Sequence, residues 1–191
     1  LQQTILSLKE SNDRFTIRSF SLLKILTVLS YGETLANLKR FDGAETIQYT
    51  HATHLEDLSL LEIVNTNKIL SEISSNEIQQ IKLVRVPRQI RDYINTLITE
   101  EEREEILKYA CNLYFGSKWR EGNLKNFHSS ILTSKDKYLN IENCKLVVTK
   151  LLSQSIKSGD ELKISRSAIL CVNYCEHVFS NHDYKNAVLC S

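Results

Sequence analysis

The chain alternates long helical patterns with short polar breaks. Apolar residues fill most sides of the segment from Phe15 to Leu29, and Tyr31-Gly32 follows it. A helix that is apolar nearly all round is typical of a buried central element, and a glycine after the last turn is a common C-terminal stop. We therefore predict a core helix that ends before Gly32.

The same period predicts further helices. Thr99 followed by Glu102 forms a capping box, and the apolar positions after it fit a helix that runs to Gly116. The positions from Leu55 to Val64 also fit a helical period. Shorter or later helical patterns cover residues 1–10, 33–40, 69–73, 88–98, 141–156 and 162–179.

Two segments carry strand patterns instead. Residues 78–86 alternate apolar and polar side chains, with the β-branched pair Val84 and Val86, and Pro87 ends the pattern. Residues 118–121 and 124–128 flank Gly122-Asn123, which predicts two short strands around a tight turn.

Composition agrees with a mainly α fold. The 191 residues include one Pro and five Gly, too few for the frequent turns of an all-β chain. Lys and Arg number 24 against 23 Asp and Glu, so the net charge is +1. This balance argues against a nucleic-acid binder that works by bulk electrostatics and against a polybasic membrane-surface protein.

Familiar catalytic motifs are absent from the sequence. The glycines, at positions 32, 43, 116, 122 and 159, cannot build a dinucleotide fingerprint or a P-loop, and neither Gly-x-Ser-x-Gly nor His-Glu-x-x-His occurs. We predict no enzymatic activity and no cofactor. A small helical enzyme that uses Cys and His is an alternative, but the cysteines and histidines form no recognisable nucleophile signature.

Cysteine usage indicates a reducing compartment. Cys111, Cys144, Cys171, Cys175 and Cys190 are odd in number and irregularly spaced, and the chain has no Asn-x-Ser/Thr sequon. The most apolar stretch, residues 21–31, contains Lys24 and is about half as long as a bilayer span requires. We expect a cytoplasmic and nuclear protein that has no membrane segment.

Two clusters have both a functional and a structural interpretation. Cys171 and Cys175, with His177 and His182, have the residue types of a zinc site, but buried cysteines on a helix face are more often core residues. Tyr114, Phe115 and Trp119, beside Lys118 and Arg120, resemble a base-stacking surface, although the near-zero net charge favours packing.

A basic stripe leaves its role open. Lys82, Arg85, Arg88 and Arg91 recur every three residues, and five glutamates follow within residues 100–105. These charges form either a solvated, self-compensating surface or a charged docking face.

Three stretches resemble the PCI-domain family, and in particular its members in the COP9 signalosome. Leu22 to Gly32 reads LLKILTVLSYG, and His54 to Leu61 reads HLEDLSLL; each is similar to a helix of that family. Ile106 to Trp119 is similar to the third helix and first wing strand of the PCI winged helix. The similarity covers roughly residues 15–127.

The resemblance implies a mainly α architecture and a structural role. An N-terminal helical bundle would span residues 1–52, a winged-helix part of the PCI domain 53–131, and a C-terminal helical extension 139–191. The implied function is that of a non-catalytic scaffold subunit of a PCI complex, above all the COP9 signalosome, which removes Nedd8 from cullins. The implied partners are the other subunits of that complex.

Other PCI assemblies remain alternatives. These are a winged-helix module associated with nucleic acid, as in messenger RNA export, and a subunit of the proteasome lid or of translation initiation. In every case the predicted partner surface combines the wing edge with the apolar stripe of residues 141–156. Its residues are Tyr114, Phe115, Trp119, Arg120, Leu124, Phe127, Val147 and Leu151. No residue is assigned to catalysis, a cofactor or a metal.

Overall fold

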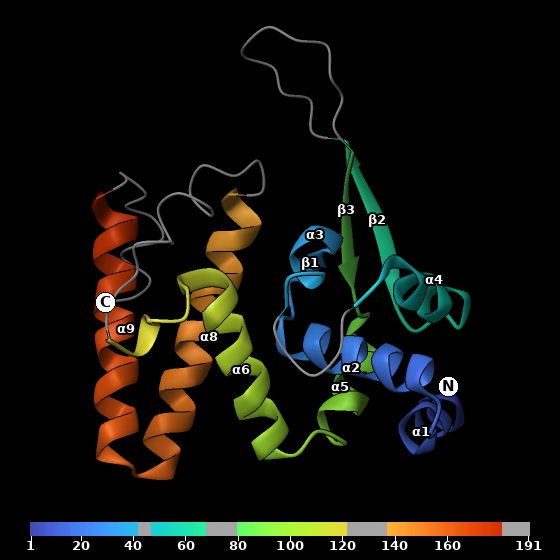
Figure 1. Cartoon of the computed structure of the whole chain (residues 1–191), viewed down its shortest axis with the longest axis horizontal. Helices are drawn as coiled ribbons and strands as arrows, with labels where there is room; N and C mark the ends of the chain where they lie inside the picture. The colour runs from blue at the N-terminus through green and yellow to red at the C-terminus, as the bar shows by residue number, and fades with distance from the viewer. Residues whose placement is uncertain (42–46, 68–79, 122–136, 181–191) are drawn as a thin grey trace, which may run out of the picture. The chain divides into compact units, whose positions relative to one another are not determined.

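The computed structural model describes residues 1–41, 47–67, 80–121 and 137–180 (Figure 1). The chain forms two compact units, Leu1–Thr99 and Glu100–Ser191, and each is described by itself. Helices make up most of the described residues, which also include one three-stranded sheet. This confirms the mainly α prediction.

Helix α2 (Arg14–Val28) is the centre of the N-terminal unit. Asp13 caps it, because its carboxylate accepts hydrogen bonds from the backbone N–H and the hydroxyl of Thr16 at 2.9 and 2.8 Å. The helix packs against α1 (Gln2–Glu10), α4 (Tyr49–Asp57) and α5 (Arg88–Asn95). Its buried residues lie on most sides, so the predicted core helix is confirmed.

The sheet of the N-terminal unit has the order β1-β3-β2, and all its pairs are antiparallel. Strand β1 (Glu33–Thr34) pairs with β3 (Gln80–Arg85), and β2 (Glu62–Asn67) pairs with β3 from the other side. Val84 in β3 therefore stands opposite Glu33 on one side and Ile63 on the other. The prediction of a strand over residues 78–86 is confirmed by β3.

Two short elements connect this sheet to the helices. Gly32 follows α2 with a φ of 84°, a conformation that favours glycine, and leads the chain into β1. Helix α3 (Leu35–Leu38) comes next, and the hydroxyl of Thr34 caps it by accepting from the N–H of Asn37 at 3.2 Å. The unit thus runs helix, strand, helix, helix, strand, strand from α2 onward.

The predicted helix over residues 55–64 is wrong in its second half. Helix α4 ends at Asp57, and the chain continues as β2 from Glu62. Ser59 has a φ of 58°, and the N–H of Leu60 donates to the carbonyl of Leu55 at 2.8 Å, so the chain turns sharply away from the helix axis. Leu60 and Leu61 are both buried in this turn, so the pattern of apolar positions in the sequence extends past the end of the helix. The predicted helix at 69–73 lies outside the described residues.

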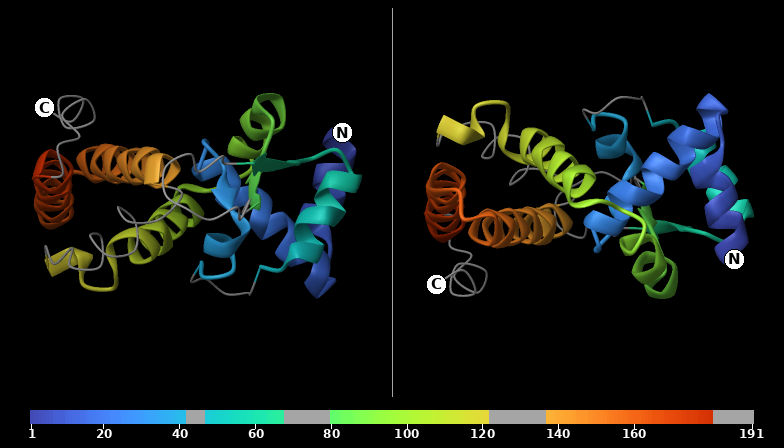
Figure 2. Two further views of the ribbon diagram at one scale, coloured as in Figure 1. Left: turned by 90° about the horizontal axis from the view of Figure 1, so that it is seen from above. Right: turned by 90° about the horizontal axis from the view of Figure 1, so that it is seen from below.

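The C-terminal unit is built from α6 (Glu100–Phe115), the 3-10 turn η1 (Trp119–Glu121), α8 (Lys137–Ser158) and α9 (Glu161–Ser180). Helices α8 and α9 lie side by side (Figures 1 and 2), and α6 packs against α8. Tyr174, fully buried, donates its hydroxyl to the carbonyl of Ile141 at 3.1 Å. The helices predicted at 99–116, 141–156 and 162–179 are confirmed, and α8 begins four residues earlier than predicted.

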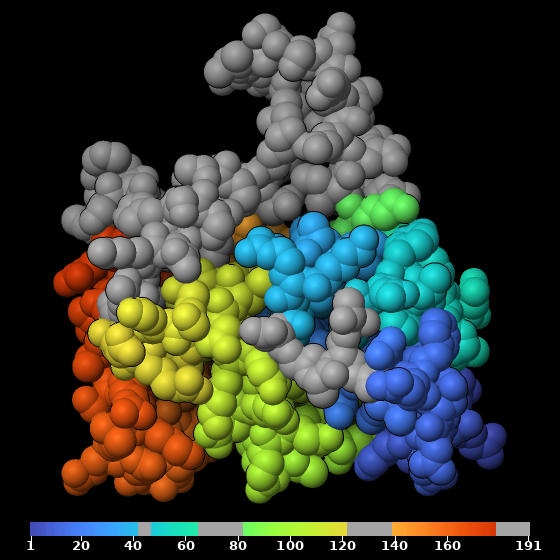
Figure 3. Space-filling model, viewed as in Figure 1, coloured from blue at the N-terminus to red at the C-terminus, as the bar shows by residue number. Residues whose placement is uncertain are grey.

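The predicted first wing strand is wrong. Residues 119–121 form η1, which lies between α6 and α9 on the face shown in Figure 3. Trp119 is 4% exposed, so its side chain turns into the unit rather than along a strand edge. The second predicted wing strand, at 124–128, lies outside the described residues. Among the helices that the structure describes, none is long and apolar enough to cross a membrane.

Candidate functional site

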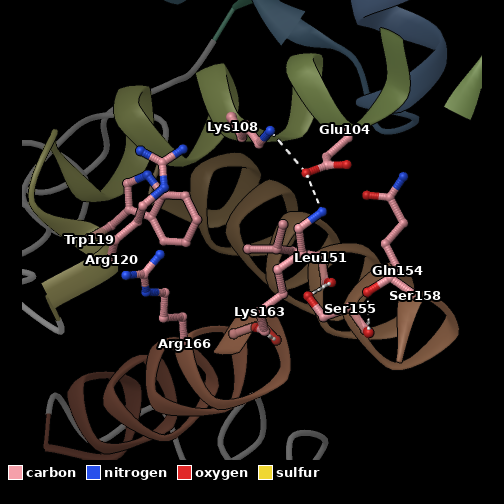
Figure 4. A pocket seen from close by; sticks show the side chains of 11 residues that line it. Glu104, Lys108, Trp119, Arg120, Leu151, Gln154, Ser155, Ser158, Lys163 and Arg166 are labelled. Atoms are coloured by element: carbon pink, nitrogen blue, oxygen red, sulfur yellow. Dashed lines mark hydrogen bonds and ion pairs between the residues drawn. The ribbon is translucent and has the colours of Figure 1, made fainter. Parts of the chain in front are cut away.

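A pocket of about 250 Å³ in the C-terminal unit brings together four cationic side chains and one carboxylate (Figure 4). Helices α6, α8 and α9 and the turn η1 each contribute residues to it, and we call it the basic pocket. Its lining consists of Glu104, Lys108, Trp119, Arg120, Leu151, Gln154, Ser155, Ser158, Lys163, Arg166 and Ser167.

Helical spacing explains why each element presents several residues. On α8, positions 151, 154, 155 and 158 follow the i, i+3, i+4, i+7 period of one face. Positions 163, 166 and 167 do the same on α9, and Glu104 and Lys108 lie one turn apart on α6. The pocket therefore lies where three helical faces meet beside η1.

Trp119 forms one wall and is firmly positioned. Gly116, with a φ of 87°, ends α6, and the N–H of Trp119 donates to the Gly116 carbonyl at 3.2 Å. The indole N–H of Trp119 donates to Oδ1 of Asn112 at 3.0 Å. The guanidinium of Arg120 lies 4.7 Å from the Trp119 ring centroid, a cation–π contact that holds this cation at the same wall.

Glu104 joins two lysines at another part of the pocket. Its Oε1 accepts from Nζ of Lys108 at 2.9 Å and from Nζ of Lys163 at 3.2 Å. The hydrogen bond from Lys108, followed by that from Lys163, holds the pKa of Glu104 below its ordinary value despite partial burial. Glu104 is therefore ionised at neutral pH and offsets part of the positive charge around it.

The structure divides the predicted partner residues into three groups. Trp119, Arg120 and Leu151 come together in the basic pocket. Tyr114, Phe115 and Val147 are at most 1% exposed and belong to the core, where the Phe115 ring packs edge-on against Tyr174 at 6.3 Å. Leu124 and Phe127 lie outside the described residues.

Sequence reasoning missed the other cations of this pocket. Lys108, Lys163 and Arg166 come from helices that are far apart in the chain, and no local motif links them. The spacing of Lys163, Arg166 and Ser167 does place them on one side of α9. This spacing predicts a polar face on α9, but it does not predict which other helices pack opposite that face.

The cysteines do not assemble a described metal centre. Cys171 and Cys175 are half-buried on α9, and His182 lies outside the described residues. Within residues 1–41, 47–67, 80–121 and 137–180, no three His, Cys, Asp or Glu side chains are grouped closely enough to hold a metal ion. Burial raises the pKa of the Cys111 thiol, which opposes formation of a nucleophilic thiolate there.

The basic stripe is locally compensated. Arg85 pairs with Glu62 at 2.7 Å, and Arg88 lies 3.6 Å from Asp92. Lys82 lies 4.3 Å from the Tyr49 ring centroid. Arg91, the last of the series, donates to the carbonyl of Ser30 at 2.9 Å. These contacts favour the solvated, self-compensating interpretation over a docking face.

A second surface of interest is the outer face of α9. Leu162, Ile169 and Val172 are 58, 47 and 56% exposed, and their spacing of seven and three residues sets them on one helical stripe. The side of α9 that carries Ser167, Leu170, Tyr174 and Val178 is buried. Helix α9 thus has two apolar sides, of which its own unit covers one.

Comparison with known proteins leaves these surfaces to be interpreted on their own chemistry. No protein family, no curated protein and no solved structure matches the chain.

Proposed function

We propose that the chain is a non-catalytic scaffold subunit, and that the outer face of α9 docks against a helix of a partner subunit. The observation that carries this proposal is the exposed stripe of Leu162, Ile169 and Val172. Single exposed apolar residues are ordinary, but three on one side of one helix form a surface that gains free energy when a partner covers it. The stripe spans ten residues, about 15 Å of helix, which suits a docked helix.

The expected gain from this docking is substantial. Burying a whole aliphatic side chain contributes roughly 1.5–3 kcal/mol, and each stripe residue still exposes about half of its surface, so each contributes roughly 1 kcal/mol. An aspartate in the stripe would also have to lose its hydration in the interface. One such substitution should therefore weaken binding more than tenfold.

The test is affinity purification from the source cell with Ile169→Asp and Val172→Asp variants. The matched control is Ile17→Asp, because Ile17 is also a half-exposed aliphatic residue, at 39%, but lies on α2. We expect partner subunits to be recovered with the parent chain and with Ile17→Asp, and to be lost with the α9 variants. Equal recovery with all variants would show that α9 is not the docking surface.

The assembly we propose is a PCI complex, with the COP9 signalosome first, acting in the cytoplasm and nucleus. This step depends on the sequence resemblance, whose stretches fall mainly on α2, α4 and α6. Mass spectrometry of the purified material tests it separately. Signalosome subunits together with cullins would support it, and a proteasome lid or initiation complex would keep the scaffold role but change the assembly. Recovery of the chain alone would contradict the scaffold role.

The proposal includes a winged helix used for protein contacts, and the element order of the N-terminal unit is the observation that supports it. This order of helix, strand, helix, helix, strand, strand and the sheet order β1-β3-β2 resemble those of a winged helix, so we propose one at residues 14–85, whereas the family resemblance implies one at 53–131. A nucleic-acid role is less favoured, because Leu1–Thr99 holds eleven Lys and Arg against eleven Asp and Glu. Helix α4, the third helix of this order, contains neither Lys nor Arg. Salt-dependent binding to RNA or DNA would reverse this preference.

A further inference from the structure

The basic pocket concentrates positive charge in a chain that is almost neutral overall. Four cations line it, Lys108, Arg120, Lys163 and Arg166, against the single carboxylate of Glu104. The local excess of three positive charges contrasts with a net charge of +1 for all 191 residues. Such a concentration costs electrostatic free energy in the absence of an anion.

The two arginines account for most of that excess. Glu104 already pairs with both lysines. Arg120 lies over the Trp119 ring, and Arg166 is exposed on α9; within the described part of the chain neither guanidinium lies within ion-pair distance of a carboxylate. Figure 4 shows both guanidinium groups at the end of the pocket where Trp119 lies. Their planar N–H donors suit a bidentate anion.

The remaining lining limits what kind of anion fits. Ser155 and Ser167 line the pocket and donate their hydroxyls to α-helical carbonyls at 2.9 Å, so the donors to an anion are the cationic side chains. Leu151 and Trp119 add an apolar wall. A volume of about 250 Å³ lies below the range of pockets that enclose drug-sized ligands, so it holds one small charged group and a few attached atoms.

We propose that the basic pocket binds a phosphomonoester dianion, with Arg120 and Arg166 as its principal ligands. Two guanidinium groups and the nearby lysines match a doubly charged, multi-oxygen anion better than a singly charged carboxylate. The serine oxygens can accept a hydrogen bond from a polar N–H or O–H group on the atoms attached to the phosphate. The proposal does not depend on the docking of α9, although Arg166 follows Leu162 by one turn and so borders the stripe.

The chain carries its own reporter for this binding. Trp119 is the one tryptophan in the sequence, and it lines the pocket against Arg120. Titration with inorganic phosphate and with O-phosphoserine should change its fluorescence. Isothermal titration calorimetry measures the affinity independently of this fluorescence. Because the second pKa of a phosphomonoester is about 6, affinity should be greater at pH 7.5 than at pH 5.

Two arginine variants and one lysine control test the site. Arg166→Gln and Arg120→Gln should each weaken O-phosphoserine binding about tenfold or more, because each removes charge-assisted hydrogen bonds. Lys157→Gln removes an exposed cation from α8 that does not line the pocket, and should change affinity less than about twofold. Far-UV circular dichroism verifies that all three variants are folded.

Two further arms identify the ligand and its source. A short peptide with a central phosphoserine should bind as well as O-phosphoserine if the phosphate belongs to a partner's side chain, and more weakly if the pocket takes free small molecules. Serine and acetate should not compete. The proposal is overturned if neither phosphate compound binds, if acetate competes equally, or if the arginine variants bind like Lys157→Gln.

Discussion

Replacement of Gly32 by alanine should destabilise the N-terminal unit severely. Gly32 has a φ of 84°, and a Cβ atom there would lie 2.7 Å from the carbonyl oxygen of Val84 and 3.0 Å from Cβ of Arg85. Val84 belongs to the central strand β3, which pairs on both sides, so its backbone cannot move away without disturbing the whole sheet. Both the backbone conformation and the close approach therefore require glycine.

The magnitude follows from these two contributions. A left-handed conformation costs an alanine roughly 1–2 kcal/mol, and the reduced freedom of the unfolded chain returns about 0.4–1 kcal/mol. Forcing an extra methyl group against fixed backbone adds roughly 1–3 kcal/mol. We therefore expect Gly32→Ala to lower the free energy of unfolding by about 2–4 kcal/mol.

Gly159→Ala separates the two contributions. Gly159 has a similar φ of 67°, but no atom lies within 4 Å of a Cβ placed there, so its replacement should cost only about 1 kcal/mol or less. Urea denaturation followed by far-UV circular dichroism measures both variants, and with a slope of about 1–3 kcal/mol/M the Gly32→Ala midpoint should fall by roughly 1–2 M. Similar losses in the two variants would refute the close approach as the cause.

Two further predictions concern the C-terminal unit. Tyr174→Phe removes the buried hydrogen bond to the Ile141 carbonyl and should lower the free energy of unfolding by about 1 kcal/mol. Tyr109→Phe removes an exposed bond to Glu105 and should lower it by less than about 0.5 kcal/mol. Urea denaturation followed by Trp119 fluorescence measures both variants. Glu104 has a lowered pKa in the folded state, so its stabilising contribution is complete above its ordinary value of 4.5 and is lost as the pH falls through the lower folded value. Glu104→Gln should therefore lose less stability than the parent chain on acidification below about pH 4.5; equal losses would contradict this assignment.

The candidate site was only partly predictable because the sequence does not reveal which side of a helix its neighbours cover. Trp119, Arg120 and Leu151 were predicted as partner residues and line the basic pocket. Tyr114 and Phe115, adjacent to them in the chain, are core residues. An aromatic side chain fits a core or a binding surface equally well, and packing against α9 decides between them.

The sequence by itself determined four long helices of this protein and its central strand. Helices α2, α6, α8 and α9 and strand β3 follow from periodic apolar positions, because these periods are properties of a single segment. Only the tertiary structure decided that residues 62–67 form a strand, because β3 supplies the hydrogen-bond partners of that segment. It also decided that Lys108, Arg120 and Arg166 share a pocket. These residues are brought together by the packing of three helices around η1, which no local pattern encodes.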